Sequence, residues 1–516
     1  MDVYTRRAFL YAAIVTLGGF VFGLDAAVIS GTVRYITVEF GLSDLEVGAV
    51  VSAPGFGVLF ALIVAGAICE SVGRKKTLIL VAALYTVSAL LSAIATSYEM
   101  LVGARFIGGL AFASLSIASM YIGEIAPSSQ RGKLVSMNQI MIVVGLTAAY
   151  FSNYFLIEFM AESPDVWRWM LGMEIVPALI WMLLLFVVPQ SPRWLLCKGK
   201  KGAAKAQLLK LVGPQRIEQE FEDLVQSKMG EKGAHLSLGK QFKAMFEKHY
   251  RKAVLIGIVF AFVQPLTGVN PILFYAPMVF EQTGIGTNAS FASTLIIGVV
   301  SFLFTALAIV LVDRLGRRPL VNSGLVASGI CLLLCFFAFK QATYTFTEES
   351  IENLNNAVPE LSFDRLQGQT FNSDTSFKAA VSETIGHDVF KANESVIIQN
   401  TISMNGTLVL IGIVGFIAAF HVSIGPLMWV VFSEIVPIQI RGVAIPTFAM
   451  VCSIISFLMQ FFFPWQLSNF GAADVFLSYA LASGLGLLLL YKMLPETKNK
   501  SIEEVDEMLH SAPQPS

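Results

Sequence analysis

Charged residues are scarce in this sequence, and neither sign of charge prevails. Only 14% of the 516 residues are Asp, Glu, Lys or Arg, whereas 55% are hydrophobic. Soluble domains carry about 25% charged residues, so this composition argues against a soluble protein. The formal net charge of −1 also lacks the basic excess with which proteins bind nucleic acid, so we expect no nucleic-acid partner.

Cysteine is rare as well. The five cysteines are Cys69, Cys197, Cys331, Cys335 and Cys452, and none lies in the polar stretch 340–404. We therefore expect neither a disulfide framework nor a metal site. The sequence also shows no nucleophile paired with a base and no phosphate-binding loop, so we expect neither an enzyme nor a bound cofactor.

Long apolar runs are abundant. A helix needs about 20 apolar residues to cross a bilayer. Twelve such runs occur, near 9–31, 47–68, 77–97, 100–122, 136–157, 169–189, 253–280, 291–312, 319–339, 405–432, 442–463 and 474–494. The first run lacks a small-residue cleavage site and continues for a full span, so we expect it to be retained rather than removed as a signal peptide. The pattern predicts an all-α membrane protein with twelve transmembrane helices.

Basic residues gather in alternate loops and predict the orientation. The loops after the second, fourth and eighth spans carry Arg74, Lys75, Lys76, Arg131, Lys133, Arg314, Arg317 and Arg318. Loops rich in Lys and Arg face the cytoplasm. Because the number of spans is even, both termini are expected in the cytoplasm, in a plasma membrane or bacterial inner membrane.

The second half of the chain repeats motifs of the first. The segment 70–75, with sequence ESVGRK, returns at 313–318 as DRLGRR, 243 residues later. Glu124 lies seven residues before Arg131, and Glu434 lies seven before Arg441, now 310 residues later. The two displacements differ by 67 residues, which is close to the length of 340–404. The chain is thus predicted to be two parallel six-helix repeats with an insert, an arrangement that places the substrate between the halves.

These repeats predict the domain organisation. The expected units are a six-helix bundle at 1–189, a cytoplasmic helical connector at 190–252, a second bundle from 253–339 and 405–494, an extracytoplasmic insert at 340–404, and a cytoplasmic tail at 495–516. The connector has fourteen Lys and Arg against six Asp and Glu, as a cytoplasmic segment should. The insert is acidic and rich in Ser, Thr and Asn. It could be an ordered cap or a flexible loop, and its composition slightly favours the loop.

One apolar run is interrupted by polar and helix-breaking residues at 264–271, with sequence QPLTGVNP. Amides in hydrocarbon need partners, and prolines remove helix hydrogen bonds. Such a segment is typical of a discontinuous helix that lines a wet cavity or meets a ligand. The alternative is a proline-kinked helix that only packs.

Two charged residues lie within apolar runs. Asp25 is inside the first span and Arg105 opens the fourth. Because an unpaired carboxylate in a bilayer is costly, we expect Arg105 to be its partner. A carboxylate that exchanges an arginine contact for a proton could couple transport to protons. The alternative is a permanent structural ion pair.

His421 is a further titratable group in an apolar run, and it could be either a packed neutral side chain or a pH-sensing contact.

The duplicated acidic and basic motifs predict a network at the cytoplasmic ends of the helices. A glycine turns the chain, and carboxylates can pair with neighbouring arginines to form a latch that breaks when the halves move. The expected members are Glu70, Arg74, Glu124, Arg131, Asp313, Arg317, Glu434 and Arg441. Simple positive-inside anchoring would explain the arginines but not the repeated acids.

Seven motifs together resemble those of one known family. They are Gly23-Leu24-Asp25 with 28–31, Tyr121 to Pro127 followed by Arg131-Gly132, 189–195, 264–277, 313–319, Gly425-Pro426 with Trp429 and Glu434, and 495–498. The chain resembles the sugar porter family of the major facilitator superfamily over all its length except 340–404, and in particular bacterial proton-coupled sugar symporters.

The resemblance implies two six-helix bundles, a cytoplasmic connector and alternating access around a central sugar. It implies sugar-binding roles for amides and aromatics, namely Gln139, Gln264, Asn270, Phe420 and Trp429. Amides donate and accept as sugar hydroxyls do, and an aromatic face stacks on a sugar ring. In proton-coupled members an aspartate occupies the position of Asp25.

The sequence also departs from the family pattern. Residues that the family uses for sugar contacts are replaced here by Pro265, Leu146, Ser301, Cys452, Ser453 and Phe274. The motif before Tyr121 has Met120 in place of proline, and the first latch loop has Glu70-Ser71 in place of Asp-Arg. The usual hexose specificity is therefore not assured by the resemblance.

The sequence predicts a secondary active transporter, acting as a monomer in the lipid bilayer, that imports a monosaccharide or related polyol by alternating access with proton symport. Two alternatives stay open. One is a facilitative uniporter without proton coupling. The other is a non-transporting sugar sensor, although such homologues usually signal through a long cytoplasmic tail and only about twenty residues follow the last span.

Overall fold

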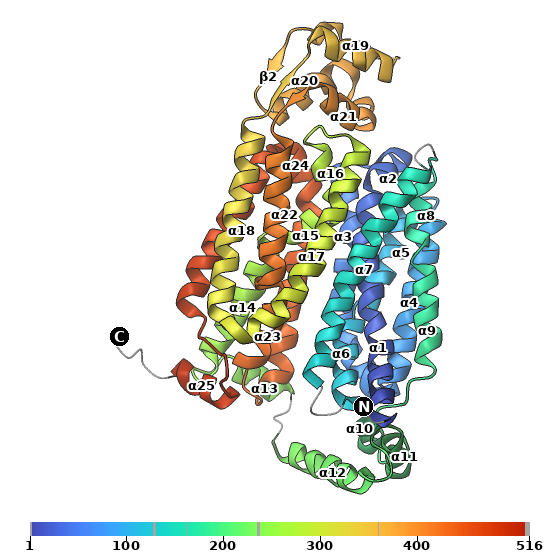
Figure 1. Ribbon diagram of the computed structural model, residues 1–516, viewed down its shortest axis with the longest axis vertical. Helices are drawn as coiled ribbons and strands as arrows, with labels where there is room; N and C mark the ends of the chain where they lie inside the picture. The colour runs from blue at the N-terminus through green and yellow to red at the C-terminus, as the bar shows by residue number, and fades with distance from the viewer. Residues whose placement is uncertain (1–2, 127–130, 161–162, 235–237, 360, 511–516) are drawn as a thin grey trace.

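Long helices run side by side and form most of the molecule, as the computed structural model shows (Figure 1). The structure describes residues 3–126, 131–160, 163–234, 238–359 and 361–510. The start of α1 and the C-terminal helix α25 lie at one end of the bundle, here called the terminal end. A small group of strands and short helices covers part of the opposite end, here called the cap end.

The first half supplies six spans, some of them made of two helices. The helices are α1 (Val3–Val28), η1 (Ile29–Gly31), α2 (Val33–Phe40), α3 (Asp44–Val72), α4 (Arg74–Ala93), α5 (Tyr98–Ala111), α6 (Ser114–Ile125), α7 (Arg131–Met160), α8 (Val166–Gly172) and α9 (Ile175–Leu185). The short helices α10 (Pro192–Cys197), α11 (Lys201–Val212), α12 (Ile217–Ala234) and α13 (Leu238–Ala244) follow at the terminal end.

The second half repeats the arrangement. Its helices are α14 (Arg251–Leu266), α15 (Val269–Phe274), α16 (Ala276–Glu281), α17 (Thr287–Leu315), α18 (Arg317–Lys340), α22 (Gly406–Val422), α23 (Ile424–Ile435), α24 (Arg441–Met493) and α25 (Ile502–His510). Within the described residues, eleven helical segments are long and apolar enough to span a membrane. The longest, α24, breaks at Gly471 and supplies two spans. The all-α architecture with twelve spans is confirmed.

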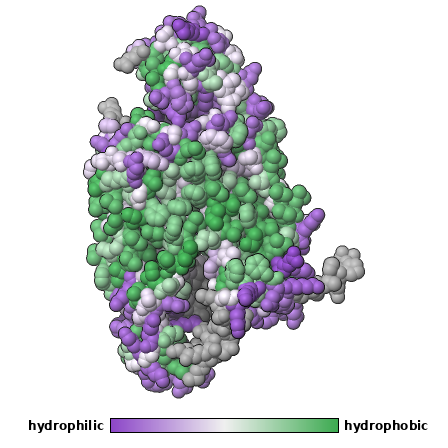
Figure 2. Space-filling view, turned by 180° about the vertical axis from the view of Figure 1, so that it is seen from behind, coloured by the Kyte–Doolittle hydropathy of each residue, from purple (hydrophilic) through white to green (hydrophobic). Residues whose placement is uncertain are grey.

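Hydrophobic side chains form a broad belt around the middle of the molecule, and hydrophilic ones gather at both ends (Figure 2). Large apolar side chains in this belt stay exposed, for example Ile63 on α3 and Leu488 on α24. Exposed leucines and phenylalanines in such numbers would make a soluble protein aggregate, whereas in a bilayer they contact lipid tails. The belt is therefore the surface that faces the membrane.

Glycines let α1 and α7 approach closely. A Cβ atom added to Gly23 on α1 would collide with the carbonyl of Ile142 on α7, and one added to Gly145 on α7 would collide with the carbonyl of Phe20. Small residues at such crossings allow backbone contact, which drives helix association in membranes where hydrophobic burial contributes little. This packing holds α7 against the helix that carries Asp25.

The two halves meet along two seams, α3 against α24 and α7 against α17. Thr147 on α7 donates to the carbonyl of Gly298 on α17 at 2.9 Å, and the Tyr150 hydroxyl donates to the carbonyl of Leu273 on α15 at 2.7 Å. Backbone carbonyls can accept these bonds because each keeps a free lone pair beyond its helical bond. Side chains of α7 thus reach from the first half into the second.

The polar interruption at 264–271 is a break between two helices. The helix α14 ends at Leu266, Gly268 adopts a left-handed conformation with φ of 84°, and α15 restarts at Val269. Glycine is required there, because other residues rarely adopt positive φ and because a side chain would collide with the Tyr479 ring. The discontinuous helix expected from the sequence is present.

The insert forms a packed cap rather than the loop that its composition favours. It contains β1 (Thr343–Thr345), α19 (Glu348–Ala357), η3 (Asp364–Leu366), β2 (Thr370–Phe371), α20 (Asp374–Ile385), α21 (His387–Thr401) and β3 (Ile402–Ser403). The strands form an antiparallel sheet in the order β2-β1-β3. Phe346, Phe363 and Phe377 are fully buried in a hydrophobic core of its own. Dispersed aromatics therefore supply enough burial to order a polar segment.

Replacing Gly145 by alanine should destabilise the bundle, because the added methyl must push α7 away from α1. The expected cost is about 1–3 kcal/mol, as for other overpacked sites. It would be measured as a lower unfolding temperature of the purified protein in detergent. Gly103→Ala is the matched control, because a Cβ there meets no atom within 4 Å. Equal unfolding temperatures for the two variants would contradict the close α1–α7 contact.

Candidate functional site

Asp25 and Arg105 form a buried ion pair inside the first half. Nη1 of Arg105 donates to Oδ1 of Asp25 at 2.5 Å, and Nη2 donates to the Asp25 backbone carbonyl at 3.2 Å. Asp25 is 0% exposed and Arg105 only 2%. Gly108, one turn after Arg105, lets α5 pack closely against α4, because a Cβ there would lie only 2.6 Å from the Ser88 hydroxyl. The pair predicted from the sequence is brought together.

A second carboxyl group, Glu174, lies beside this pair and was not identified from the sequence. It is 1% exposed at the junction of α8 and α9, and its charged neighbours are Asp25 and Arg105. Asp25 Oδ2 and Glu174 Oε1 have no hydrogen-bond partner among the described residues. Two carboxyl groups facing one arginine cannot both carry a charge at low cost, so the group suits proton binding. The sequence does hold a signal for Glu174, because an acidic residue within the apolar run 169–189 is itself a candidate for function.

The three amide residues implied by the resemblance come from three helices. Gln139 lies on α7, Gln264 near the end of α14, and Asn270 on α15 just after the break. All three are half-buried. Oε1 of Gln264 accepts a weak hydrogen bond from the Cys452 thiol at 3.5 Å. Among the described residues the other amide groups show no partner, which leaves them available for a ligand.

The two aromatic residues differ in exposure. Phe420, near the end of α22, is buried, and a Cβ added to Gly425 would lie 2.6 Å from its ring. Trp429, on α23, is 46% exposed and stands edge-on to Phe432. The helices α22 and α23 separate at Ser423, so the second half has another break near these aromatics. In the described part of the chain, no hydrogen bond or ring contact joins the five predicted sugar-binding side chains to one another.

His421 is packed rather than exposed. Its Nδ1 lies 3.1 Å from the Thr305 hydroxyl, which connects α22 with α17. Its Nε2 is buried and has no partner among the described residues. Ser301, one turn from Thr305 and one of the positions that depart from the family pattern, also keeps an unpartnered buried hydroxyl. These polar atoms lie in the same part of the second half as Phe420.

Two ion pairs at the terminal end occupy equivalent places in the two halves. Arg74, at the start of α4, donates from Nε and Nη2 to Glu124 Oε1 at 3.0 and 2.8 Å. Arg317, at the start of α18, donates to both oxygens of Glu434 at 2.8 to 3.2 Å. Each pair lies within one half, so the duplication seen in the sequence is a duplication of this contact.

The other predicted gate residues do not form buried pairs of this kind. Glu70 is exposed, and Asp313 is 3.7 Å from Arg317 with an exposed side chain. Arg441 donates to the carbonyls of Ser433 and Val436 at 2.6 and 2.9 Å and so caps the end of α23. The side chain of Arg131 lies outside the described residues, as does Pro127 of the same motif.

Glu496 caps the start of α18 and is part of the motif 495–498. It accepts bonds from the backbone N–H groups of Arg317 and Arg318 at 3.0 and 3.1 Å. Burial disfavours its charge, but these N–H groups and that of Lys498 outweigh burial and hold the pKa of Glu496 below its usual value. Thr497 donates to Glu434 at 2.6 Å, so the end of the chain braces the second ion pair.

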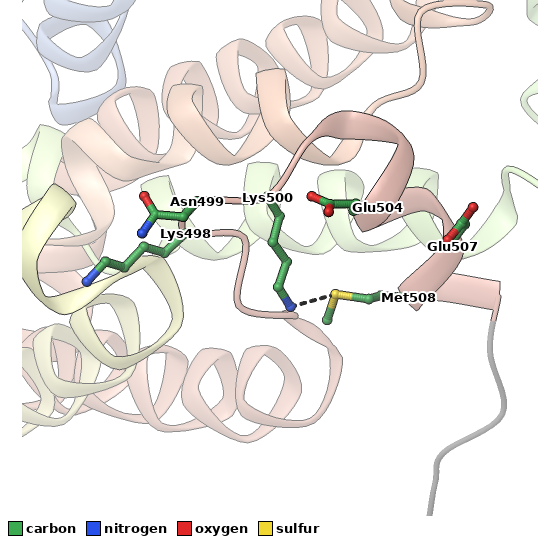
Figure 3. A pocket seen from close by; sticks show the side chains of 6 residues that line it. All are labelled: Lys498, Asn499, Lys500, Glu504, Glu507 and Met508. Atoms are coloured by element: carbon green, nitrogen blue, oxygen red, sulfur yellow. Dashed lines mark hydrogen bonds between the residues drawn. The ribbon is translucent and has the colours of Figure 1, made fainter.

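An open hollow at the C-terminal segment does not resemble a substrate site. It is lined by Lys498, Asn499, Lys500, Glu504, Glu507 and Met508. The side chains of Lys498 and Asn499 point away from the two glutamates, and Lys500 contacts Met508 (Figure 3). The lining groups therefore do not converge on one point, as a binding site requires.

A sequence model of the family described as "Sugar (and other) transporter" matches residues 11–355 and 385–509. The chain belongs to the sugar transporter family. The gap in the match, 356–384, falls within the cap. Relatives within the family include the arabinose-proton symporter of Bacillus subtilis, 31% identical over 97% of this chain and 94% of that protein. The D-xylose-proton symporter of Escherichia coli is 30% identical over 97% of this chain and 95% of that protein.

Solved structures of the family show the same fold. The inward-open xylose transporter XylE of E. coli superposes with a TM-score of 0.74 at 27% identity, covering 97% of this chain and 99% of that one. XylE bound to 6-bromo-6-deoxy-D-glucose superposes with a TM-score of 0.70 at 28% identity, covering 98% and 99%. The chain therefore has the major facilitator fold of a transporter, and not that of an enzyme.

Replacing Glu434 by glutamine should destabilise the second half at the terminal end. The substitution removes the charge that faces Arg317 and weakens the bond from Thr497, with an expected cost of about 1–3 kcal/mol. Thermal unfolding of the purified protein measures it. Asp313→Asn is the control, because that exposed carboxylate should contribute less than about 1 kcal/mol. A larger loss for Asp313→Asn than for Glu434→Gln would contradict the assignment of the principal pair.

Proposed function

We propose that this protein imports a monosaccharide or related polyol together with protons, by alternating access. The Asp25–Arg105 pair, buried within the first half of a chain that belongs to the sugar transporter family, supports this proposal most strongly. The names of the arabinose and xylose relatives as proton symporters support it. A charge in this position is expensive to keep for stability alone.

Proton coupling follows from the chemistry of the buried group. When Asp25 is charged, Arg105 neutralises it, and when a proton binds, Arg105 is free to turn to another acceptor such as Glu174. Arg105 can therefore pair with either of the two carboxyl groups, and the two pairings leave a similar total charge in the site. A coupled transporter needs two such states of similar free energy. Substrate and proton shift the same equilibrium and thereby affect each other's binding.

The sugar is proposed to bind between the halves, at Gln139, Gln264, Asn270, Phe420 and Trp429. Gln264 and Asn270 flank the break at Gly268, so the ligand would contact a segment whose backbone is not fully paired within a helix. Gln264 accepts its hydrogen bond from Cys452, and Cys452 is one of the positions at which this chain departs from the family pattern. We therefore expect the contact between Gln264 and Cys452 to be the main source of any difference in sugar selectivity between this protein and its family.

The terminal end is proposed to face the cytoplasm, because the basic loops lie there. Both termini and the connector 190–252 are then cytoplasmic, and the cap at 340–404 is extracytoplasmic.

The domain bounds are proposed as the sequence predicts them. One bundle is 1–189, the other is 253–339 with 405–494, and the tail is 495–516. Glu70, Arg74, Glu124, Arg131, Asp313, Arg317, Glu434 and Arg441 are proposed as the cytoplasmic gate. We propose a monomer in the plasma membrane or bacterial inner membrane.

Asp25→Asn should abolish proton-driven accumulation and leave exchange of sugar across the membrane. The amide keeps the shape of the carboxyl group but cannot bind and release a proton. Uptake of radiolabelled sugar into liposomes measures both activities, with and without an inward proton gradient. Accumulation by Asp25→Asn equal to that of the unmodified protein would contradict the coupling role. Exchange without accumulation by the unmodified protein would indicate the uniporter.

Gln264→Ala and Asn270→Ala should each weaken sugar affinity. A ligand hydroxyl left without its partner costs about 1–3 kcal/mol, which is roughly 5-fold to 150-fold in Kd. A thermal-shift screen of pentoses, hexoses, inositols and disaccharides would first identify the ligand, and calorimetry would measure its Kd. Asn469→Ala is the control, because Asn469 is exposed and bonds only its own helix. Unchanged affinity in both test variants would place the site elsewhere.

A further inference from the structure

Three parts of the chain meet at the cap end. Arg34, on α2 of the first half, donates to the hydroxyl of Thr287 on α17 of the second half. Its Nη1 also lies 3.8 Å from Oε1 of Glu281, at the end of α16. The cap stands over this contact, with Glu394 of α21 close enough to Glu281 to repel its charge. The halves are therefore held together here by side chains that no sequence motif identified.

The cap is anchored to the second half by a buried charged cluster. Nζ of Lys378 donates to Gln282 Oε1 at 2.9 Å and lies 2.9 Å from Glu394 and 3.2 Å from Asp374. Gln282 in turn donates to Glu394 at 3.2 Å. Lys378 is only 9% exposed. Because removing one member would leave buried charges unpaired, the cap should move with the second half as one body.

The cap also reaches the first half. Lys391 on α21 pairs with Asp44 at the start of α3, with Nζ 2.8 Å from Oδ1. The two side chains are 19% and 24% exposed, whereas that of Lys378 is 11% exposed. A partly exposed pair contributes about 1 kcal/mol or less, so it can break without unfolding the cap. The cap thus bridges the two halves by one strong contact and one weak contact.

Closure of the cap end buries Glu281. The residue lies beyond the spanning segment Arg251–Phe274, yet it is only 9% exposed. Burial raises the pKa of Glu281 to about 7, with Arg34 and Thr287 opposing the rise and Glu394 adding to it. The charged and titratable groups around it are Arg34 and Tyr35 on α2 and Glu394 on α21. When the halves separate, Glu281 meets water and its proton affinity should fall.

We propose that Arg34, Glu281 and the cap contact Lys391–Asp44 form the outer gate of this transporter, and that closing the gate takes up a proton at Glu281. The direction follows from linkage. A carboxyl group that binds a proton more tightly when buried stabilises the closed gate in acid. That stabilisation is complete below the ordinary pKa of 4.5 and is lost as the pH rises to about 7. Arg34 keeps its bond to Thr287 in either state of Glu281.

This gate rests on the proposed function for its placement outside the cell and for its part in transport. Protons that arrive from an acidic exterior would favour closure after loading, which is the order that an importer needs. The conformational equilibrium itself can be measured without sugar and without a proton gradient. If the conformational equilibrium does not respond to pH as proposed, the assignment as a sugar transporter still stands. If the protein does not transport sugar, the pH response of the conformational equilibrium can still be measured.

The experiment measures the separation of the halves by double electron–electron resonance. Spin labels are placed at Val38→Cys on α2 and Glu352→Cys on α19, both exposed, with the exposed Cys197 replaced by serine. The full-length protein is studied in lipid nanodiscs from pH 5 to pH 8. The ratio of open to closed populations is expected to rise by up to about tenfold per pH unit as far as pH 7, and then to level off.

Glu281→Gln should remove this dependence and stay closed throughout, because glutamine is neutral as protonated glutamate is. Glu383→Gln, an exposed carboxyl on α20 of the cap, is the matched control and should keep the transition. The proposal is overturned if Glu281→Gln retains the full transition. It is equally overturned if the unmodified protein opens as the pH falls, or does not respond to pH.

A second pair of variants tests the cap contact. Lys391→Ala and Asp44→Asn should each raise the ratio of open to closed populations about 2-fold to 5-fold at every pH, with the shape of the pH dependence retained, because a partly exposed pair of this kind is worth ~1 kcal/mol or less. Both residues are partly exposed, so the variants are expected to fold, and thermal unfolding checks this. If both variants show the same open populations as the unmodified protein, the Lys391–Asp44 contact is not part of the gate.

Discussion

A carboxylate buried in the hydrocarbon region must be neutralised, and in this protein Arg105 neutralises Asp25. Much of the first half serves this contact. Gly108 lets α5, which carries the arginine, pack closely against α4, and the glycines at the α1–α7 crossing hold the helix of Asp25 in place. Because Glu174 shares the same arginine, the pair does not have a single satisfied arrangement. A group of this kind contributes little to stability and is well suited to carry a proton.

The two ends of the molecule are built differently. At the terminal end, Arg74–Glu124 and Arg317–Glu434 each tie together helices of one half, so each half keeps its own shape when it moves. At the cap end, Arg34 and Lys391 reach from one body to another. Two members of the cap's charged cluster, Asp374 and Lys378, lie in the stretch 356–384 that the family model does not match.

Much of this architecture could be predicted from the sequence. The apolar runs gave the spans, the repeat of 70–75 at 313–318 gave the two halves, and the scarcity of membrane charge made Arg105 the partner of Asp25. Other features depend on contacts between distant segments. Glu174 stands alone in its run, and nothing along the chain shows that it faces Asp25. The gate residue Glu281 follows an apolar run as any surface acid could. The cap looked flexible because its phenylalanines are widely spaced, and only folding gathers them into a core.

Sugar and proton are proposed to cross the membrane together on this one protein. The most direct measurement uses liposomes that contain the unmodified protein and an internal pH dye, with equal pH and no voltage on the two sides at the start. Addition of the sugar outside should acidify the interior, because each sugar that enters down its gradient brings a proton with it. Entry of the sugar, measured with a radiolabel in the same liposomes, without any change of internal pH would contradict the account.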